Sequence, residues 1–517
     1  MPTMLARRSL PFLFAAPALR PARAQPVHRL RLLHMNDFHS RHEGADATGA
    51  ACRAGRPCYG GAARLVSAFA AARAEAAAEG RASLALDAGD QFQGTLFYTQ
   101  HRGLTEAGVL RRWGVQGMVP GNHEFNHGPA NLARFLDALG QPLLAANLDT
   151  SAEPALHGRV VPGQVFEIGG ARIGVVGLAL EGTPSISSPG PNLRFTSAEE
   201  AAERTIAAMR AAGPITIIAL SHRGFGADLA LAAALPGIDV IVGGHSHTMV
   251  DPTRLVEGRD RPVRIVQAGA LGRWAGVLDL DLEASGRVVA HGAGLRELDA
   301  ALPEDAGTAS FIAEQAAPMA ELRARPAGRT GGSFDIASCR QAECAIGNLV
   351  TEAMLAATPS ADLALTNSGA IRAGLPAGQV TLGDVLTVLP FGNTLATVRL
   401  RGADLLAALE HGLGRGGTGA FPQMAGLAVE FAPQAPAGQR VLAARIKQGP
   451  KAGPVDPGAT YVVVTNNFLR NGGDAYVMLR DRALEFYDAG APLDDALIDF
   501  MARALVVPRL DGRIRPR

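Results

Sequence analysis

The feature that most constrains the fold is an alternation of two kinds of segment between about residues 28 and 300. Apolar runs of strand length, such as RLRLLHM (29–35), SLALDAG (83–89) and ITIIALSH (215–222), alternate with alanine-rich stretches such as GAARLVSAFAAARAEAAAE (61–79). Strands that alternate with helices are typical of α/β domains, in which helices cover the faces of a sheet. We therefore predict an α/β domain, residues 27–303, for this part of the chain.

A second domain is expected because a chain of 517 residues exceeds the size at which a single hydrophobic core keeps growing. Residues 304–324 are predicted to form one long helix that ends before the proline- and glycine-containing stretch RPAGRTGGS (325–333). Beyond it the pattern mixes helices at 345–357 and 402–413 with strands around 361–367, 394–400, 427–432 and 460–467. We predict a linker helix and hinge at 304–330 and a C-terminal domain at 331–517.

The first 24 residues differ in kind from the rest of the chain. Arg7 and Arg8 precede the apolar run LPFLFAAPAL (10–19), and ARA (22–24) follows it. This order is typical of a secretory signal with a small-residue cleavage site near Ala24, and the run is too short to span a bilayer. We expect a periplasmic or secreted protein without a membrane anchor, with the twin-arginine route as an alternative to the general one.

Charge gives no reason to expect nucleic acid or anionic lipid as a partner, because 49 basic residues balance 48 acidic ones. The four cysteines form two local pairs, Cys52 with Cys58 and Cys339 with Cys344. In an exported protein such pairs favour two small disulfide loops. A four-thiolate zinc site is the alternative, and the position of one pair in each half of the chain disfavours it.

Polar side chains that can bind metals follow five of the apolar runs. Because the carboxyl ends of strands in an open α/β sheet converge on one crevice, we expect these side chains to lie together. The candidates, in chain order, are Asp37, His39, Asp90, Asn122, His123, His222, His245 and His247.

Mixed oxygen and imidazole ligands suit zinc, manganese, iron or cobalt. Without His123, seven of these candidates remain as ligands; they are too many for one four-coordinate ion and suit two divalent ions bridged by one carboxylate. The histidines outside this pattern are interpreted as surface or packing residues: His28, His34, His42, His101, His127, His157, His291 and His411.

The glycine-rich stretch GLGRGGTG (412–419) resembles a phosphate-binding loop only superficially. A phosphate-binding loop of that kind follows a strand and opens a helix, whereas this stretch follows a predicted helix. We interpret it as a flexible loop.

With these motifs the chain resembles the calcineurin-like metallophosphoesterases. Within that family it is similar to the secreted 5'-nucleotidases, which include ecto-5'-nucleotidase and the UDP-sugar hydrolases. The resemblance implies a four-layer αββα sandwich, a linker helix and a separate C-terminal α/β nucleotide-binding domain. It also implies the ligand sets. Asp37, His39 and His247 would hold the first metal ion, Asp90 would bridge, and Asn122, His222 and His245 would complete the second site.

Four C-terminal segments carry a second match to the same family: SCRQAECAIGNL (338–349), NSGAIR (367–372), VLPFGN (388–393) and NNFLRNGGDAY (466–476). By this resemblance Arg340, Asn367 and Arg372 grip phosphate or ribose, which suits the fork geometry of arginine. Phe391 and Phe468 would stack on the two faces of a base, with Asn393 nearby and Asp474 on the ribose hydroxyls. The second cysteine pair would flank Arg340 and hold it in place.

The resemblance implies a phosphohydrolase that releases phosphate from nucleoside 5'-monophosphates, with diphosphates and UDP-sugars as further candidate substrates. His123 would stabilise the developing charge or protonate the leaving oxygen. The family branches named above have GNHEFD where this chain has GNHEFN (121–126), so Asn126 replaces the aspartate that orients the histidine. An amide accepts the imidazole N–H but brings no charge, so we expect a lower pKa for His123 than an aspartate would give.

Three alternatives stay open. GNHEFN also resembles the family's 2',3'-cyclic-nucleotide 2'-phosphodiesterase/3'-nucleotidase branch. A thiosulfate-ester hydrolase shares the N-terminal fold, and a nucleotide-binding protein that has lost catalysis belongs to another functional class. We expect a nucleotide as the partner of the chain, and a monomer or a homodimer.

Overall fold

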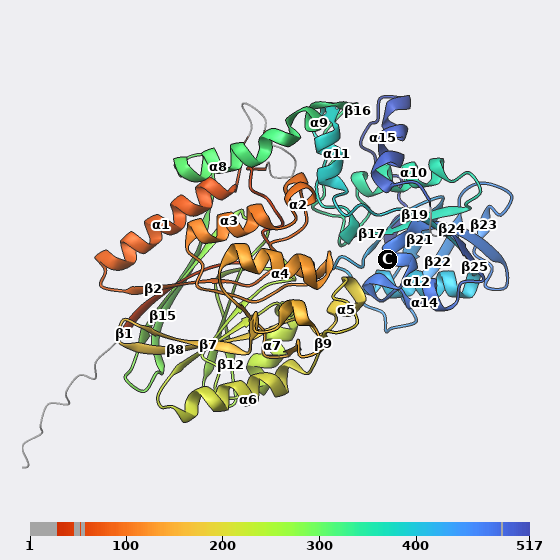
Figure 1. The fold of residues 1–517 in the computed structure, drawn as a ribbon. Helices are drawn as coiled ribbons and strands as arrows, with labels where there is room; N and C mark the ends of the chain where they lie inside the picture. The colour runs from red at the N-terminus through yellow and green to blue at the C-terminus, as the bar shows by residue number, and fades with distance from the viewer. Residues whose placement is uncertain (1–27, 46–51, 53–56, 488–489) are drawn as a thin grey trace, which may run out of the picture.

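The computed structural model describes residues 28–45, 52, 57–487 and 490–517. The predicted signal sequence (1–24) lies outside these described residues. Figure 1 shows two domains side by side, the N-terminal one in red to green and the C-terminal one in blue, with a green helix running above the first domain toward the second. None of the helices in the described ranges combines the length and the apolar character that crossing a membrane requires.

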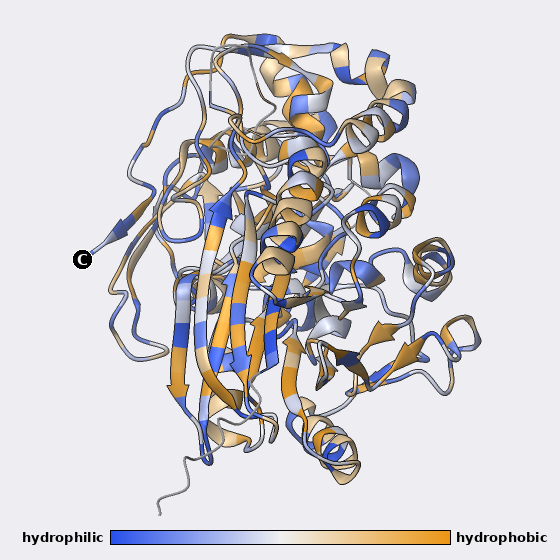
Figure 2. Ribbon diagram, turned by 90° about the vertical axis from the view of Figure 1, so that its left-hand side faces the viewer, coloured by the Kyte–Doolittle hydropathy of each residue, from blue (hydrophilic) through white to orange (hydrophobic). Residues whose placement is uncertain are grey.

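The N-terminal domain contains two mixed sheets. The first has the strand order β15 (Val288–Glu297), β14 (Trp274–Leu282), β1 (His28–Met35), β2 (Ala82–Asp87) and β3 (Gly117–Met118). The second has the order β12 (Met249–Glu257), β13 (Pro262–Ala268), β11 (Val240–Gly243), β10 (Thr216–Ser221), β8 (Ala171–Leu178) and β7 (Gly163–Ile168). β1, β2 and β3 are parallel to one another, as are β8, β10, β11 and β13. Figure 2 shows apolar, orange segments along the strands.

Helices cover the outer faces of both sheets. On the side of the first sheet lie α1 (Ala62–Ala78), α2 (Leu96–His101), α3 (Leu104–Trp113) and α4 (Gly128–Leu139); on the side of the second lie α6 (Ala198–Ala211) and α7 (Phe225–Ala234). Short elements complete the domain: β4 (Leu143–Leu144), β5 (Leu148–Asp149), β6 (Val160–Val161), β9 (Arg194–Phe195), α5 (Thr183–Ile186), and 3-10 turns η1 (His123–Phe125) and η2 (Pro154–Leu156).

Three apolar clusters hold these four layers together, because the central strands are buried on both faces. On β1, Leu32 faces the second sheet and packs in one cluster with Val175 and Val242. The next residue, Leu33, faces the opposite way and packs in the cluster that contains Phe69 of α1. A third cluster joins the second sheet to α6 and α7. This layering confirms the αββα sandwich.

The C-terminal domain is built on a five-stranded sheet, β20 (Pro422–Ala425), β17 (Leu363–Asn367), β24 (Thr460–Asn466), β19 (Leu395–Arg401) and β25 (Glu485–Tyr487). A four-stranded sheet accompanies it, with the order β23 (Gly453–Pro454), β22 (Val441–Ile446), β21 (Leu427–Phe431) and β26 (Ile514–Pro516). A separate two-stranded sheet consists of β16 (Pro326–Thr330) and β18 (Gly378–Thr381). The helices are α10 (Ala345–Ala357), α11 (Leu382–Val388), α12 (Gly402–Leu413), α13 (Asn467–Arg470), α14 (Val477–Asp481) and α15 (Leu493–Arg503), with 3-10 turns η4 (Ser368–Ala370) and η5 (Gly473–Ala475). Two clusters of its own, one on each side of the main sheet, form its core.

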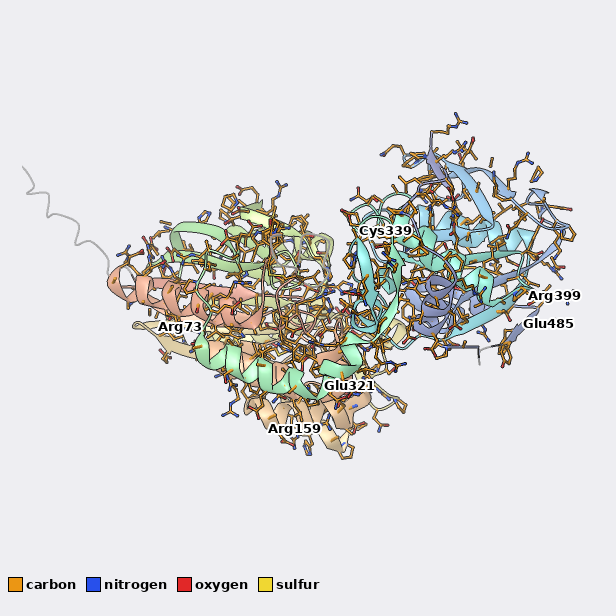
Figure 3. The ribbon with its side chains drawn as sticks, turned by 90° about the horizontal axis from the view of Figure 1, so that it is seen from above. Arg73, Arg159, Glu321, Cys339, Arg399 and Glu485 are labelled. Atoms are coloured by element: carbon orange, nitrogen blue, oxygen red, sulfur yellow. A yellow bond between two sulfur atoms is a disulfide. The ribbon has the colours of Figure 1, made fainter. Side chains whose placement is uncertain are left out.

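The segment between the domains differs from the predicted single helix. Asp305 caps the N-terminus of α8 (Ala306–Ala316), a 3-10 turn η3 (Ala317–Met319) follows, and α9 (Ala320–Ala324) continues to β16. Pro318 explains the break, because proline has no N–H for the helical hydrogen bond and its ring crowds the preceding turn. β16 occupies the last part of the range assigned to the hinge and pairs with β18. Glu321 of α9 lies where this segment passes from one domain to the other (Figure 3).

Candidate functional site

The predicted metal-binding side chains follow strands of both sheets of the sandwich. Asp37, His39 and Asp90 follow β1 and β2, and Asn122 lies beyond β3, all in the first sheet. The three remaining histidines, His222, His245 and His247, follow β10 and β11 of the second sheet. Because the two sheets are stacked with these ends at the same edge of the sandwich, the loops still converge on one site.

The loops adopt a backbone conformation that the sequence did not reveal. Five of the metal-ligand candidates have left-handed φ values: 50° at Asp37, 52° at His39, 57° at Asp90, 73° at His245 and 54° at His247. Residues other than glycine rarely adopt this backbone conformation, and it persists where the surrounding structure enforces it. Here the N–H of Asp37 donates to the Gly89 carbonyl at 2.8 Å and that of His39 to the Asp90 carbonyl at 3.1 Å.

One group of ligand atoms gathers around Asp37. Its Oδ1 lies 3.3 Å from His247 Nε2 and 3.9 Å from His39 Nε2, and the two imidazole nitrogens are 3.1 Å apart. A second group contains Asp90, His222 and His245, with Asp90 Oδ2 3.2 Å from His222 Nε2. Asp90 also belongs to a group with His39 and His123, so this carboxylate lies between the two sets.

The donor set fits two divalent ions. Asp37, His39, Asp90 and His222 are buried, and oxygen and imidazole donors within 4.8 Å of one another form each group. The buried Asn122 Oδ1 has no hydrogen-bond partner in the described part of the chain. A buried amide oxygen without a partner is costly unless it has a ligand of another kind, which a metal ion supplies.

Neighbouring groups fix the orientation of the rings and of the Asp90 loop. The Nδ1 of His39 lies 3.1 Å from the Phe92 carbonyl and that of His222 lies 2.5 Å from the Ala88 carbonyl, which leaves each Nε2 facing the site. The buried Glu124 carboxylate accepts four backbone N–H groups. They belong to Gly121 (2.6 Å), Asp90 (2.9 Å), Gln91 (2.8 Å) and Phe92 (3.2 Å).

The electrostatics of the site prepare Asp90, His245 and His247 for a metal ion, whereas His222 must first lose a proton. Burial lowers the pKa of His245 and of His247 to about 4, so both rings are neutral at pH 7 and offer a lone pair. Burial acts against the ionised form of Asp90, yet the charges of His222 and His123 hold its pKa well below the usual range. Burial also lowers the pKa of His222, but the adjacent Asp90 dominates and raises it to about 10.

His123 contacts Asn126 as the motif predicted, and the C-terminal domain as well. Its Nδ1 lies 2.7 Å from Asn126 Oδ1, so the amide oxygen accepts the ring proton and Nε2 points toward Asp90 Oδ2, 4.0 Å away. The Phe391 ring stacks on it with the centroids 5.7 Å apart and the planes 21° from parallel. Burial and the charge of Arg372 lower the pKa of His123, against the effects of Asp90 and the Asn126 contact.

A cavity of about 430 Å³ joins the metal-binding loops to the C-terminal domain. All seven C-terminal residues predicted to contact substrate line it together with the N-terminal site: Arg340, Asn367, Arg372, Phe391, Asn393, Phe468 and Asp474. At its inner end Arg372 Nη2 is buried without a hydrogen-bond partner among the described residues. Burial and the neighbouring charge of Arg340 lower the pKa of Arg372 to about 9. An anion between these two arginines would relieve both effects.

At the outer end, Asp474 and Phe468 are held by their neighbours. Asn367 Nδ2 donates to Asp474 Oδ2 at 2.7 Å, and Asn466 Nδ2 donates to Asn367 Oδ1 at 3.0 Å. The Phe468 ring packs directly on Gly473, where an added Cβ would lie 2.5 Å from the ring. Only glycine permits this approach.

Both predicted disulfides are present, Cys52–Cys58 and Cys339–Cys344, with Cα–Cα distances of 5.5 Å and 5.0 Å. Cys339 lies on the side of the C-terminal domain that faces the first domain (Figure 3). The buried Gln423 binds the loop around Arg340 at three points. Its Nε2 donates to the carbonyls of Cys339 and Ala342, each at 2.8 Å, and its Oε1 accepts the N–H of Cys344 at 3.2 Å.

Sequence reasoning missed part of the cavity wall. Beyond α12 the glycine-rich stretch is a loop, as predicted, but Arg415, Gly417, Thr418 and Gly419 of it line the cavity, a role that the sequence reasoning did not assign to it. The N–H of Gly417 donates to the Arg340 carbonyl at 2.7 Å. His411, interpreted as an ordinary histidine, holds the Asp474 carbonyl through Nε2 at 2.9 Å. The sequence signal for this part of the cavity wall was the glycine-rich stretch. It was set aside because it follows a helix, whereas known phosphate-binding loops follow a strand.

Comparisons with known proteins point to the same family in both domains. Residues 30–249 match the family model "Calcineurin-like phosphoesterase", and residues 322–481 match "5'-nucleotidase, C-terminal domain". The 5'-nucleotidase of Mus musculus is 31% identical over 97% of this chain and 93% of its own length. The trifunctional nucleotide phosphoesterase YfkN of Bacillus subtilis is 33% identical over 86% of this chain, which spans only 33% of that longer protein. The structure of a 5'-nucleotidase precursor from Thermus thermophilus has a TM-score of 0.88 and 36% identity, covering 94% of this chain and 99% of that one.

Proposed function

Because this chain belongs to the 5'-nucleotidase family of calcineurin-like phosphoesterases, we propose that it hydrolyses nucleoside 5'-monophosphates to a nucleoside and phosphate. Membership of the family makes it a metal-dependent phosphoester hydrolase. The observation that carries the proposal is the cavity itself, because the metal-binding loops and the nucleotide-contacting residues of the other domain line the same space.

The metal centre would take two divalent ions, zinc, manganese, cobalt or iron. Asp37, His39 and His247 would hold the first and Asn122, His222 and His245 the second, with Asp90 shared between them. When bound, such a pair of ions polarises the phosphate and lowers the pKa of a water molecule. The carbonyls of Phe92 and Ala88 would keep His39 and His222 in their orientation, and Glu124 would do the same for the Asp90 loop.

The C-terminal domain positions the nucleotide. Arg340 and Arg372 bind phosphate oxygens as paired forks, which the unpartnered Nη2 of Arg372 supports. Phe391 and Phe468 hold the base by stacking, which tolerates any base. Asp474, braced by Asn367, accepts the ribose hydroxyls.

His123 would act as the proton donor to the leaving group. Its Nδ1 donates to Asn126, so Nε2 faces the phosphate end of the cavity, and the protonated ring carries there the proton that it can give away. In the reaction a water oxygen bonds to phosphorus, the bond to O5' breaks, and His123 gives its proton to the departing oxygen. The activity closest to this one is hydrolysis of 2',3'-cyclic nucleotides, because the GNHEFN motif with Asn126 also resembles that branch of the family.

We also propose that the protein acts outside the cytoplasm, in the periplasm or as a secreted enzyme. Both disulfides support this, because such bonds form and persist in oxidising compartments.

The test is an assay of the chelated protein refilled with Zn²⁺, Mn²⁺, Co²⁺ or Fe²⁺, with AMP, 3'-AMP, 2',3'-cyclic AMP and UDP-glucose as substrates. We expect metal-dependent phosphate release with AMP as the best substrate. The matched control is His123→Ala, which should keep both ions and lose most of the turnover. Preference for the cyclic substrate would move the assignment to the phosphodiesterase, and no metal-dependent release from any substrate would refute the hydrolase function.

A further inference from the structure

A second cavity, of about 320 Å³, lies beside the first and also between the two domains. The two cavities share five lining residues, Ser246, His247, Arg340, Arg372 and Gly417. The remaining wall of the second cavity comes from Leu271 of the first domain and from Ile336, Ala337, Cys339, Gln341, Ser368 and Ile371 of the second. The arginines and a metal-ligand histidine therefore form the boundary between the cavities, and each cavity reaches them from its own side.

The second cavity suits the passage of an anion. Its inner end carries the two arginines, and no carboxylate lines it within the described ranges of the chain. The neutral side chain of Gln341 can donate hydrogen bonds to an anion, whereas the hydroxyls of Ser246 and Ser368 already donate to protein acceptors. Ala337 and Gln341 at its rim are exposed, so the cavity reaches solvent. An oxyanion that leaves the arginines by this route meets neither a like charge nor a further strong binding group that would retain it.

A bound nucleotide leaves few other routes by which phosphate can leave the site or water can enter it. On the proposed function, on which this inference rests, the base and ribose occupy the end of the first cavity near Phe468 and Asp474. The nucleoside then closes that cavity while the phosphate lies at its inner end. In-line displacement needs the attacking water on the side of phosphorus opposite to the nucleoside, and each turnover consumes one such water.

We propose that the second cavity is the route by which inorganic phosphate leaves, and water enters, while the nucleoside is still bound. The water oxygen bonds to phosphorus, the bond to O5' breaks, the nucleoside takes the proton, and the phosphate departs past Arg340 and Arg372 toward Gln341 and Ala337. The competing model is release of both products together when the domains separate, which makes the second cavity irrelevant to the rate.

The first test fills the cavity. Ala337→Trp places a large side chain at its rim, and Ala337→Ser is the matched variant that leaves it open. In a single turnover of the metal-loaded protein, acid quenching counts all phosphate formed, whereas a fluorescent phosphate sensor counts only free phosphate. We expect Ala337→Trp to keep the quenched rate and to delay free phosphate by about tenfold or more, so that release becomes limiting. The serine variant should resemble the original chain.

The second test uses charge instead of bulk. With the first cavity saturated by adenosine, inorganic phosphate should still reach the site and broaden its ³¹P signal on Mn²⁺-loaded protein. Gln341→Lys should strengthen that phosphate binding, and Gln341→Glu should weaken it, because the charge lies on the path of the anion. Ala337→Trp should slow the exchange of phosphate without moving its affinity.

The outcomes separate the two hypotheses. If quenched samples contain no phosphate from AMP, the proposed function has failed. If they do, but free phosphate and free adenosine appear together and Ala337→Trp changes neither rate, the route is refuted and domain separation releases both products. Loss of the ³¹P effect on addition of adenosine would refute it independently.

Discussion

At the scale of single residues, the protonation of His123 depends on its burial and on neighbours whose effects oppose one another. Burial and Arg372 lower its pKa, whereas Asp90 and the Asn126 contact raise it. Asn126 raises this pKa less than a carboxylate would, because its amide oxygen accepts the Nδ1 proton without adding a negative charge. The side chain at 126 therefore controls the pH range in which His123 can give a proton away.

We predict that Asn126→Asp moves the high-pH limb of the rate profile upward. As pH rises through the pKa of His123 the ring loses its proton and turnover falls. A carboxylate at position 126 favours the charged ring, so the pKa rises and the limb should shift by about one pH unit. The measurement is kcat/KM for AMP against pH. Asn126→Ser, which keeps an acceptor without charge, should leave the limb near its original position, and an unmoved limb in the aspartate variant would show that this contact does not set the pKa.

Glu124 acts on the metal centre without contacting it. Its two oxygens accept the N–H groups of Gly121, Asp90, Gln91 and Phe92, which ties the loop after β2 to the loop after β3. Glu124→Gln turns one oxygen into an N–H₂ that cannot accept, so part of this loop is released. We expect metal affinity to fall by about 10–100-fold, measured by competition with a chromophoric chelator.

The control for that prediction is His123→Ala, which removes a neighbouring side chain but none of the loop contacts. It should lose turnover and keep both ions. If both variants bind metal as tightly as the original chain, Glu124 supports folding only and does not position the ligands.

The identity of the site residues could be predicted because each ligand type stands at a strand end next to glycine or serine. The conformation could not. The left-handed φ values of Asp37, His39, Asp90, His245 and His247 arise from hydrogen bonds between loops distant in sequence, such as that from Asp37 to Gly89. No local pattern encodes such contacts.

At the scale of elements, the turn that joins α13 to η5 shapes the base-binding end of the cavity. Gly473 permits the close approach of Phe468, and a Cβ there would lie 2.5 Å from the ring. We predict that Gly473→Ala displaces the ring and lowers kcat/KM for AMP relative to ribose 5-phosphate by roughly tenfold, because stacking contributes about 1–3 kcal/mol per base. Ribose 5-phosphate has no base and serves as the internal reference.

Gly416→Ala is the matched control, because a Cβ at Gly416 would meet nothing within 4 Å. It lies in the glycine-rich loop between α12 and β20 and should leave the ratio unchanged. An unchanged ratio in Gly473→Ala as well would mean that Phe468 does not contact the base.

Element boundaries followed from local patterns more reliably than the relations between elements. Helices α10 and α12 match the predicted ranges 345–357 and 402–413. The break at Pro318 was missed because an alanine-rich pattern continues on both sides of it. The glycine-rich loop became part of the site through tertiary contacts, such as those of Gly417 with Arg340 and of Gly419 with Gly369, which no local signal contains.

At the scale of the whole molecule, the catalytic cavity is divided between two independently packed halves. The metal ligands belong to loops over the three N-terminal clusters, whereas Arg340, Arg372 and Phe468 belong to a domain with two clusters of its own. Sequence predicted the two domains and their separate motifs. It could not predict that they meet as closely as the stacked rings of His123 and Phe391 do.

This division predicts how ligands protect the backbone from hydrogen exchange. Metal ions alone should slow exchange around 121–126 but not around 466–475, because no proposed metal ligand lies in the C-terminal domain. Adenosine alone should do the reverse. A nucleotide together with bound metal should protect both segments by more than the sum of the protection by metal alone and by adenosine alone. The reason is that the phosphate of the nucleotide joins the metal centre to the arginines. Exchange measured by mass spectrometry on the full chain tests this. In Arg372→Ala the excess protection should vanish while each separate effect remains. Protection of 466–475 by metal alone would show instead that the two halves are already coupled without substrate.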